Sequence, residues 1–338
     1  MRVGVIGLGF MGTTHIRALK SIAGAELAAV SSRDEKKLAG DLSAIQGNLG
    51  GPAERQDFGA VARYREIREL LEDPDVDAVD ICLPTDQHAE IAIDALRRGK
   101  HVLVEKPMAL DEAAANLMIA EAAKHKRVLM VAQVLRFLPA YQALGDILAR
   151  ESTGLMRTAI FRRRCAAPAW SAWLTDPKQS GGGVFDLLIH DVDMCLHLFG
   201  VPEAVSATGY EALDSGVDVI TATLYYPGGP TAVITGGWHH PKSYPFSMEY
   251  TVVADGGTVE YSSLAGAPVC YSADGEREAL QLEEKDGYRA EIEYFLDCAR
   301  RGVRPELCPP EDSARAVAVT RWMLEARTRN GEKIACDR

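Results

Sequence analysis

Several features that would place the chain in a special class are absent or scarce. No apolar run in the 338 residues approaches the roughly 20 residues of a membrane-spanning helix, so we expect no membrane partner. The seven cysteines are scattered and form no C-x-x-C pair, which disfavours both a disulfide framework and a zinc site. No internal repeat or low-complexity tract stands out. We therefore expect a cytoplasmic protein with reduced thiols.

Positive charge is also in short supply. The chain has 37 Lys and Arg residues against 48 Asp and Glu, a net charge of -11, which argues against nucleic acid as a partner. An anionic cofactor is not excluded, because helix ends and a few local cations can bind it. The hydrophobic content of 47% is typical of a globular protein, and the length suits two domains.

The N-terminus contains the most informative motif. An apolar stretch, Arg2–Gly7, predicts a buried strand, and it runs directly into a G-x-G-x-x-G sequence formed by Gly7, Gly9 and Gly12. A helical pattern follows at once, through Leu19. Strand, glycine turn and helix in this order are the fingerprint of a dinucleotide-binding fold, in which the free N–H groups at the start of the helix face the pyrophosphate. We include Phe10 and Met11 of this turn among the cofactor-binding residues.

The end of the second expected strand, Glu26–Ser32, addresses the choice between NAD and NADP. In such folds an acidic residue at this point binds the ribose 2′-hydroxyl and repels a 2′-phosphate. This chain has Ser32 and Arg33 there, which can donate a hydrogen bond and pair with a phosphate, so the sequence favours NADP over NAD. Two alternatives remain open: Asp34 or Glu35 performs the acidic role, or Arg33 is merely solvated.

The first half of the chain alternates strands and helices, which predicts a doubly wound parallel sheet. Gln46–Gly59, with four glycines and one proline, predicts a surface loop. The expected strands are Arg2–Gly7, Glu26–Ser32, Ala62–Tyr64, Ala78–Leu83, His101–Glu105 and Val128–Ala132. The expected helices after the first are one capped by Asp34, then Arg65–Glu72, Gln87–Arg98 and Asp111–His125.

The fifth strand ends in Glu105-Lys106-Pro107. A lysine at the carboxyl end of a parallel strand points into the crevice that holds the ligand in this class of sheet. There it could exchange protons with a reacting alcohol or carbonyl. Taken alone, it is better explained as an ordinary surface lysine at a strand end.

A second candidate stretch, SGGGVFDLLIHDVDMCLHLFG, spans Ser180–Gly200. From Val184 it predicts a helix on which Asp186 and His190 lie one turn apart on the same face. A carboxylate beside an imidazole fixes the tautomer of the ring and suits a general acid/base. Two alternatives stay open: a metal site built from Asp186 and His190, with or without Asp193 or His197, and helix polarity without chemistry.

After Gly200 the pattern changes to alternating polar and apolar residues with Gly and Pro turns, which predicts an antiparallel meander. We expect an amphipathic helix over Tyr288–Arg301, with Ile292, Phe295 and Leu296 inward, and a last helix over Asp312–Arg327. The expected domains are residues 1–132 and 133–338, with the helix 312–327 packing back on the first domain. The meander strands are Ala204–Glu211, Val217–Tyr226, Thr231–His239, Ser247–Ala254 and Thr258–Tyr261.

Taken together, these motifs resemble the Gfo/Idh/MocA oxidoreductases along nearly the whole chain. The resemblance depends on G-x-G-x-x-G-x-x-H from Gly7 to His15, on GKHVLVEKPMA from Gly99 to Ala109, on RF followed by P-x-Y from Arg136 to Tyr141, and on GGG…D-x-x-x-H-D-x-D from Gly181 to Asp193. It implies a Rossmann domain followed by a domain with a large open, mostly antiparallel sheet. It also implies homodimers or homotetramers that pair through that sheet.

The resemblance assigns roles to individual residues. Lys106 corresponds to the lysine that hydrogen-bonds the reacting oxygen, and His190 with Asp186 corresponds to the acid/base pair. The Lys106-Pro107 bond is implied to be cis. The implied cofactor-side positions are Gly7, Gly9, Gly12, Leu83, Pro84, His88, Glu105, Lys106 and Pro107. Ser32 and Arg33 depart from many relatives, which have an acid there.

The sequence as a whole predicts an NAD(P)-dependent dehydrogenase or reductase of a sugar, inositol or related polyol. The alternatives are a non-catalytic NAD(P) or sugar sensor of the same fold and a metal-dependent lyase or hydrolase. The substrate itself is not readable from the sequence. Candidate pocket residues, chosen because polar and aromatic groups suit a hydroxylated ring, are Arg136, Tyr141, Trp170, Trp173, His239 and His240.

Overall fold

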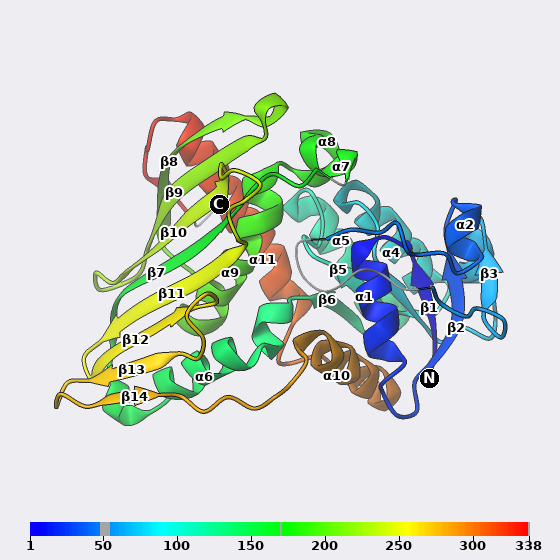
Figure 1. Cartoon of the computed structure of the whole chain (residues 1–338), viewed down its shortest axis with the longest axis horizontal. Coiled ribbons are helices and arrows are strands. Elements are labelled where there is room, and N and C mark those ends of the chain that lie inside the picture. The colour runs from blue at the N-terminus through cyan, green and yellow to red at the C-terminus, as the bar shows by residue number, and fades with distance from the viewer. Residues whose placement is uncertain (48–54, 170, 337–338) are drawn as a thin grey trace. The chain divides into compact units, whose positions relative to one another are not determined.

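A computed structural model describes residues 1–47, 55–169 and 171–336 of the chain. These residues form two compact units (Figure 1). Unit 1 combines Met1–Val134 with Asp286–Ala314, and unit 2 combines Leu135–Lys285 with the chain from Arg315 on. The sequence predicts one boundary at residue 132, whereas the contacts group the later stretch Asp286–Ala314 with unit 1.

Unit 1 is built on a six-stranded parallel sheet with the order β3-β2-β1-β4-β5-β6. This is the doubly wound sheet that the alternating pattern predicts. The strands are β1 (Arg2–Ile6), β2 (Glu26–Ser31), β3 (Ala62–Tyr64), β4 (Ala78–Ile81), β5 (His101–Glu105) and β6 (Leu129–Ala132). The order reverses between β1 and β4, which places the ligand crevice of such a sheet beside the glycine turn.

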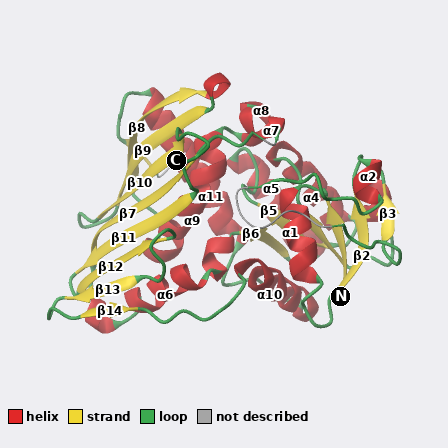
Figure 2. Ribbon diagram, viewed as in Figure 1, coloured by secondary structure: helices red, strands yellow, loops and turns green. Residues whose placement is uncertain are grey.

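Helices cover this sheet (Figure 2). They are α1 (Phe10–Leu19), α2 (Glu35–Leu38), α3 (Ile67–Glu72), α4 (His88–Arg97), α5 (Glu112–His125) and α10 (Gly287–Arg301). Helix α10 packs on α1, β5 and β6, and its predicted inward residues Ile292, Phe295 and Leu296 are buried. An amphipathic stripe of this kind is most stable against an apolar neighbour, and here that neighbour is the Rossmann sheet.

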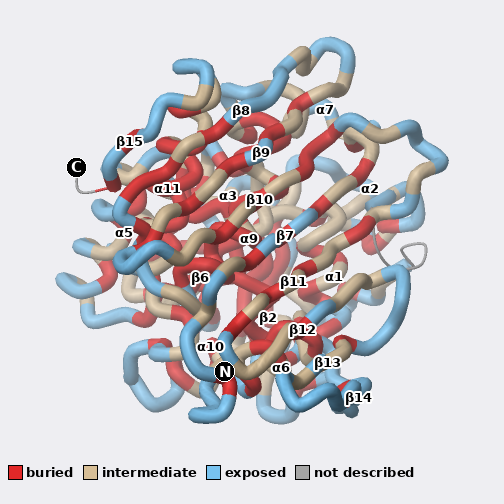
Figure 3. The backbone as a smooth tube through the Cα atoms, turned by 90° about the vertical axis from the view of Figure 1, so that its left-hand side faces the viewer, coloured by how far each residue is buried: buried red, intermediate tan, exposed pale blue. Residues whose placement is uncertain are grey.

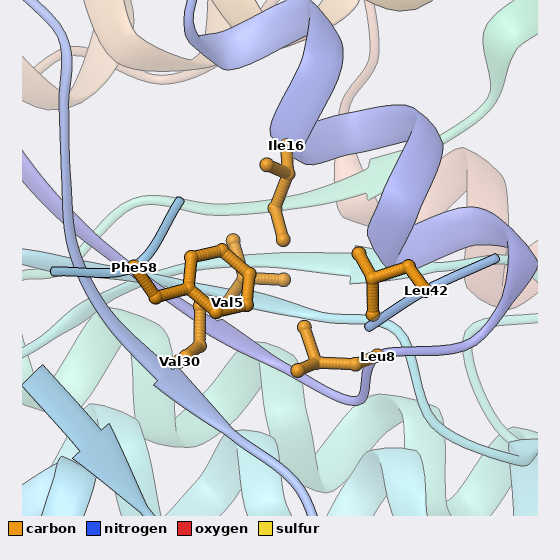
Figure 4. Close-up of a cluster of buried hydrophobic side chains, with 6 residues drawn as sticks. All are labelled: Val5, Leu8, Ile16, Val30, Leu42 and Phe58. Atoms are coloured by element: carbon orange, nitrogen blue, oxygen red, sulfur yellow. The ribbon is translucent and has the colours of Figure 1, made fainter. Parts of the chain in front are cut away.

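A cluster of buried side chains joins α1 to the sheet (Figure 4). Its members are Val5, Leu8, Ile16, Val30, Leu42 and Phe58. Fully burying a side chain of this size contributes about 1.5–3 kcal/mol. Phe58 is 3% exposed, so the stretch that we expected to be a surface loop supplies a core residue. Residues 48–54 of that loop lie outside the described residues. Helix α2 ends at Leu38, and Leu42 is buried beyond the end of this helix.

Unit 2 is built on a nine-stranded sheet with the order β14-β13-β12-β11-β7-β10-β9-β8-β15. Its strands alternate buried residues with partly exposed ones (Figure 3), as β9 does along its whole length. The strands are β7 (Met156–Cys165), β8 (Ala204–Ala212), β9 (Val217–Tyr225), β10 (Thr231–Trp238), β11 (Ser247–Ala254), β12 (Gly257–Ser262), β13 (Val269–Ser272), β14 (Arg277–Ala279) and β15 (Ile334–Ala335).

The expected meander is interrupted. Strand β7 lies between β10 and β11 and pairs in parallel with β10, from Thr158 opposite Thr231 to Cys165 opposite Trp238. Alternation shows that a segment is a strand, but it does not identify the neighbouring strand, so no pattern in the sequence predicts this insertion. The sheet remains mostly antiparallel, as the resemblance implied. The helices of unit 2 are α6 (Pro139–Leu148), α7 (Ala172–Thr175), α8 (Pro177–Ser180), α9 (Gly183–Phe199) and most of α11 (Pro310–Thr328).

Candidate functional site

The glycine turn of unit 1 has the geometry that a dinucleotide site needs. Gly7 has a φ of +97°, and a Cβ there would lie 2.4 Å from the carbonyl oxygen of Cys82. A Cβ on Gly12 would lie 1.9 Å from the carbonyl oxygen of Gly7, so only glycine allows α1 to pack this closely on β1. A Cβ on Gly9 would meet no described atom within 4 Å. The open side at Gly9 is where a pyrophosphate can approach the backbone.

The end of β2 shows which side chains are available to the adenosine ribose. The carboxylate of Asp34 accepts hydrogen bonds from the backbone N–H groups of Lys36 (2.9 Å) and Lys37 (3.3 Å), so Asp34 caps α2 as predicted. The Ser32 hydroxyl accepts from the Asp34 backbone N–H at 3.2 Å. Arg33 is exposed, and no ion pair holds its guanidinium among the described residues. The capping role makes Asp34 a weaker candidate for binding the ribose.

His88 joins the two strand ends that border the crevice. Its Nε2 lies 2.8 Å from the carbonyl oxygen of Leu83, which follows β4, and its Nδ1 lies 2.8 Å from that of Pro107, which follows β5. Burial lowers the pKa of His88, and a neutral ring can donate to only one of the two carbonyls. His88 therefore donates to one of the two loops that carry Pro84 and Lys106 and lies against a carbonyl of the other. The Lys106-Pro107 peptide bond is cis.

Lys106 lies half-buried at the end of β5, where the motif placed it. Its backbone N–H donates to Oε2 of Glu105 at 3.0 Å, and Glu105 is 6% exposed. On the other side of that carboxylate, Oε1 lies 3.1 Å from Nε2 of His15. His15 also pairs with Asp80, at 2.9 Å between Nδ1 and Oδ2.

This buried group, comprising His15, Asp80, Glu105 and the nearby Glu291, was not singled out from the sequence. His15 entered the sequence analysis only as the last residue of a motif. A signal existed: Asp80 is an acid inside the apolar strand β4, and Glu291 is an acid on the apolar face of α10. Ionisable residues at such positions need partners, and a search for partners would have paired them.

Helix α9 carries the predicted acid/base pair in unit 2. It begins after two glycines in the left-handed region, Gly181 (φ +81°) and Gly182 (φ +96°), and the carboxylate of Asp218 accepts the backbone N–H of Val184 at 2.8 Å. Asp186 and His190 are both half-buried on this helix, one turn apart. Their side chains therefore share one face, as the spacing predicts.

Asp193, which continues this face of α9, has a structural role. Asp193 is fully buried and forms a bidentate ion pair with Arg136, at 2.8 Å from Nε to Oδ2 and 2.8 Å from Nη2 to Oδ1. A carboxylate held in this way is a poor metal ligand, which argues against a metal site that includes Asp193. Arg136 is 2% exposed, which places it inside the fold of unit 2 rather than on a pocket wall.

The other candidate substrate residues are dispersed. Tyr141 is 1% exposed and packs edge-on against Tyr250, with ring centroids 5.4 Å apart. Trp173 is half-buried on α7, and Trp170 lies outside the described residues. His239 is exposed after β10, where its neighbour His240 stacks on Tyr244 at 3.9 Å. Burial argues against Tyr141 as a direct substrate contact, and Trp173 and His239 stay predictions.

Comparisons with known proteins agree with this arrangement. The NAD-binding Rossmann-fold model of the Gfo/Idh/MocA oxidoreductases matches residues 1–133, and the model of the Gfo/Idh/MocA C-terminal domain matches residues 141–260. D-xylose 1-dehydrogenase (NADP(+)) 2 of Haloferax volcanii is 30% identical, over 95% of this chain and 94% of its own length. The chain belongs to the Gfo/Idh/MocA family. It is an NAD(P)-dependent oxidoreductase with a Rossmann domain and a mostly antiparallel second domain.

Two further relatives of this Gfo/Idh/MocA member cover most of its length. Myo-inositol 2-dehydrogenase of Thermotoga maritima is 28% identical over 90% of each chain. The solved structure of UDP-N-acetylglucosamine 3-dehydrogenase from Acidithiobacillus ferrooxidans superposes with a TM-score of 0.78, at 26% identity over 97% of each chain. No helix among the described residues is long and apolar enough to cross a lipid bilayer.

Proposed function

We propose that this oxidoreductase transfers a hydride between NADP and a hydroxyl carbon of a sugar, inositol or related polyol. The observation that carries the proposal is the strand-end geometry of unit 1, where a glycine turn open at Gly9 accompanies Lys106 at the end of β5. The named relatives act on xylose and myo-inositol, which supports a small hydroxylated substrate.

The residues present fit a dinucleotide. The space that a Cβ would fill at Gly7 and Gly12 is already occupied by backbone, whereas Gly9 leaves its side of the turn open to the pyrophosphate. Gly7, Gly9 and Gly12 with the first turn of α1 would hold the phosphates, and the strand ends at Pro84 and Lys106 would border the nicotinamide. When bound, the nicotinamide supplies the hydride acceptor for oxidation or the hydride donor for reduction.

Three side chains would perform the proton chemistry. The Lys106 ammonium donates a hydrogen bond to the reacting oxygen and stabilises the negative charge that develops on it. His190 accepts the hydroxyl proton in oxidation and returns it in reduction, while Asp186, one turn earlier on α9, fixes the ring tautomer. Lys106 belongs to unit 1, whereas Asp186 and His190 belong to unit 2. The roles proposed for these three residues therefore rest on the resemblance to the family.

The preference for NADP rests on the end of β2. Asp34 points its carboxylate at the backbone of α2, while Arg33 is exposed and Ser32 offers a hydroxyl. A guanidinium at this position can pair with a 2′-phosphate, and the nearby Glu35 is already paired with Arg65 at 2.8 Å. The name of the Haloferax volcanii relative specifies NADP(+), which points in the same direction.

Replacing the guanidinium tests this preference. Arg33→Ala is expected to weaken NADP binding by about 10- to 100-fold, the loss of one charge-assisted hydrogen bond to a phosphate, and to leave NAD binding nearly unchanged. The Kd values for both nucleotides can be measured by fluorescence titration. Arg68→Ala is a matched control, because Arg68 is an exposed arginine of unit 1 that pairs with Glu72. Equal losses for the two nucleotides would contradict the assignment of Arg33.

The function itself is tested by assaying reduction of NAD and NADP across aldoses, inositols and other polyols. Turnover with one class identifies the substrate, and faster reduction of NADP supports the proposed preference. Tight binding of a nucleotide without turnover of any member would favour the sensor over the enzyme. Metal analysis of the same preparation tests the lyase or hydrolase alternative.

The proposal extends to assembly and compartment. The outer face of the nine-stranded sheet carries apolar side chains such as Ile160, which is 44% exposed on β7, and this supports pairing of two copies through the sheet as a dimer or tetramer. Light scattering after gel filtration measures the assembly. In the described part of the chain, none of the seven cysteines forms a disulfide, which supports the cytoplasm as the compartment.

A further inference from the structure

Four ionisable side chains from four elements of unit 1 meet in one buried cluster. His15 of α1 lies at its centre, with Nδ1 at 2.9 and 3.1 Å from the two carboxylate oxygens of Asp80 on β4. Its Nε2 lies 3.1 Å from Oε1 of Glu105 on β5 and 3.9 Å from Oε1 of Glu291 on α10. His15 and Glu291 are fully buried, and Asp80 and Glu105 are nearly so.

This geometry determines the state of the ring. A neutral imidazole has one N–H and one lone pair, and here the lone pair would face a carboxylate oxygen on either side. Only the imidazolium carries positive charge toward both carboxylates, with Nδ1 donating to Asp80 and Nε2 forming an ion pair with Glu105 at 3.1 Å. Burial alone would lower the pKa of His15, but the charge of Asp80 and the neighbouring Cys82 raise it well above its ordinary value of 6.5.

The remaining groups around the ring are neutral or already paired. Burial raises the pKa of Glu291 well above its ordinary range, and neither of its oxygens has a hydrogen-bond partner among the described residues, which suits a protonated acid. Burial likewise raises the pKa of the Cys82 thiol and of Tyr288, whose ring centre is 6.2 Å from that of His15. Burial would raise the pKa of Glu105, but its contact with His15 lowers it, helped by Lys106.

Glu105 connects the cluster to the strand end. While Oε1 faces His15, Oε2 accepts the backbone N–H of Lys106 at 3.0 Å. The imidazolium thus fixes one oxygen of a carboxylate whose other oxygen fixes the backbone of Lys106. We infer that His15 is a positioning residue for Lys106, acting as the permanent cation of a buried carboxylate cluster. The expected effect of His15 on turnover rests on the proposed function, whereas the charge of its ring does not.

Helix α10 closes the cluster. Glu291 and Tyr288 both belong to it, and α10 packs on α1 and β5. One potential ligand atom each from His15, Asp80 and Cys82 lies within 4.8 Å of the others. The hydrogen-bond distance of 2.9 Å between Nδ1 and the Asp80 carboxylate favours a proton on that nitrogen over an ion.

The charge of the ring can be measured directly on the full chain by nitrogen-15 NMR of its histidines. We expect one imidazole with both nitrogens protonated at pH 8, assigned to His15 by its absence in His15→Gln. A ring that is neutral at pH 7, or whose Nδ1 loses its proton on addition of zinc, overturns the inference. If His15→Gln does not fold, Asp80→Asn assigns the signal instead, because removing that charge must shift the titration of His15 toward 6.5.

Turnover and binding then separate positioning from a purely structural role. His15→Gln is expected to lower kcat by about 10²-fold, as for a misplacement near 1 Å, and to leave the Kd for the nucleotide nearly unchanged. His125→Gln is the matched control, because His125 on α5 contacts Glu121 at 3.3 Å from a partly exposed position. An unchanged kcat in folded His15→Gln overturns the inference. Absence of turnover in the unaltered chain would count against the proposed function alone, since the imidazolium signal needs no substrate.

The free energy of unfolding tests the charge of His15 without any ligand. Because the folded pKa of His15 is raised, its stabilising contribution is fully present below pH 6.5 and is lost as pH rises through the folded value. The free energy of unfolding, followed by urea titration, should therefore fall above pH 6.5 in the unaltered chain and less steeply in His15→Gln. Parallel curves would contradict the charge that we assign to the ring.

Discussion

Lys106→Ala is expected to lower kcat by about 10²- to 10³-fold, the usual effect of removing one preorganised donor to a developing oxyanion. The loss should appear in kcat, because the ammonium is needed most in the transition state, while the Kd for NADP stays close to that of the unaltered enzyme. The glycine turn that would hold the phosphates does not include this side chain. Steady-state kinetics with the substrate found by the panel, together with nucleotide titration, measure both quantities.

Lys124→Ala is a suitable control for this variant. Lys124 lies on α5 with 64% of its side chain exposed, and its contact with Glu121 is a surface pair within one helix. It should retain full activity. Full activity in Lys106→Ala as well would contradict the catalytic role, and equal losses of turnover and nucleotide binding would assign Lys106 to the cofactor instead.

Asp193→Ala is expected to destabilise unit 2 by about 3–5 kcal/mol, since it leaves the guanidinium of Arg136 buried without its carboxylate. Both side chains are about 1% exposed, and the pair is bidentate. The double variant Arg136→Met/Asp193→Leu should recover most of the lost stability, because it removes both charges and fills the same space with apolar atoms. Urea unfolding followed by circular dichroism provides the comparison.

An ion pair on the surface provides the comparison for Asp193→Ala. Arg157 and Asp255 form an ion pair between half-exposed side chains, and Arg157→Ala should change the unfolding curve little. If Asp193→Ala were as stable as the unaltered chain, the buried pair would not be a structural element of α9. If it instead lost a bound metal that the unaltered chain retains, the metal interpretation of this helix face would return.

The features that the sequence predicted well are local ones. The glycine turn, Lys106 at a strand end, and Asp186 with His190 on one helix face each depend on a few neighbouring residues whose spacing determines their geometry. The same holds for Asp34 as the cap of α2. Short-range rules suffice where the backbone itself places the side chain.

The features that escaped prediction depend on distant partners. Nothing in the alternation of β7 shows that it pairs with β10, and nothing in the stripe of α10 shows that it packs on α1. Asp193 and His190 lie on the same face of α9, so the helical pattern does not distinguish them. Asp193 has a structural role because Arg136, from another element, pairs with it. His15 and Glu291 are far apart in sequence, so their meeting requires the complete fold.

The composition of unit 1 from two separate stretches affects how the chain can fold during synthesis. A nascent chain that has emerged only as far as Val134 has all six strands of the first sheet but lacks α10, which the ribosome makes after the whole nine-stranded sheet except β15. Until then α1 and β5 lack the helix that packs on them, and His15 lacks its neighbours Glu291 and Tyr288. The nucleotide domain, although first in the sequence, is therefore among the last parts of the molecule to be completed.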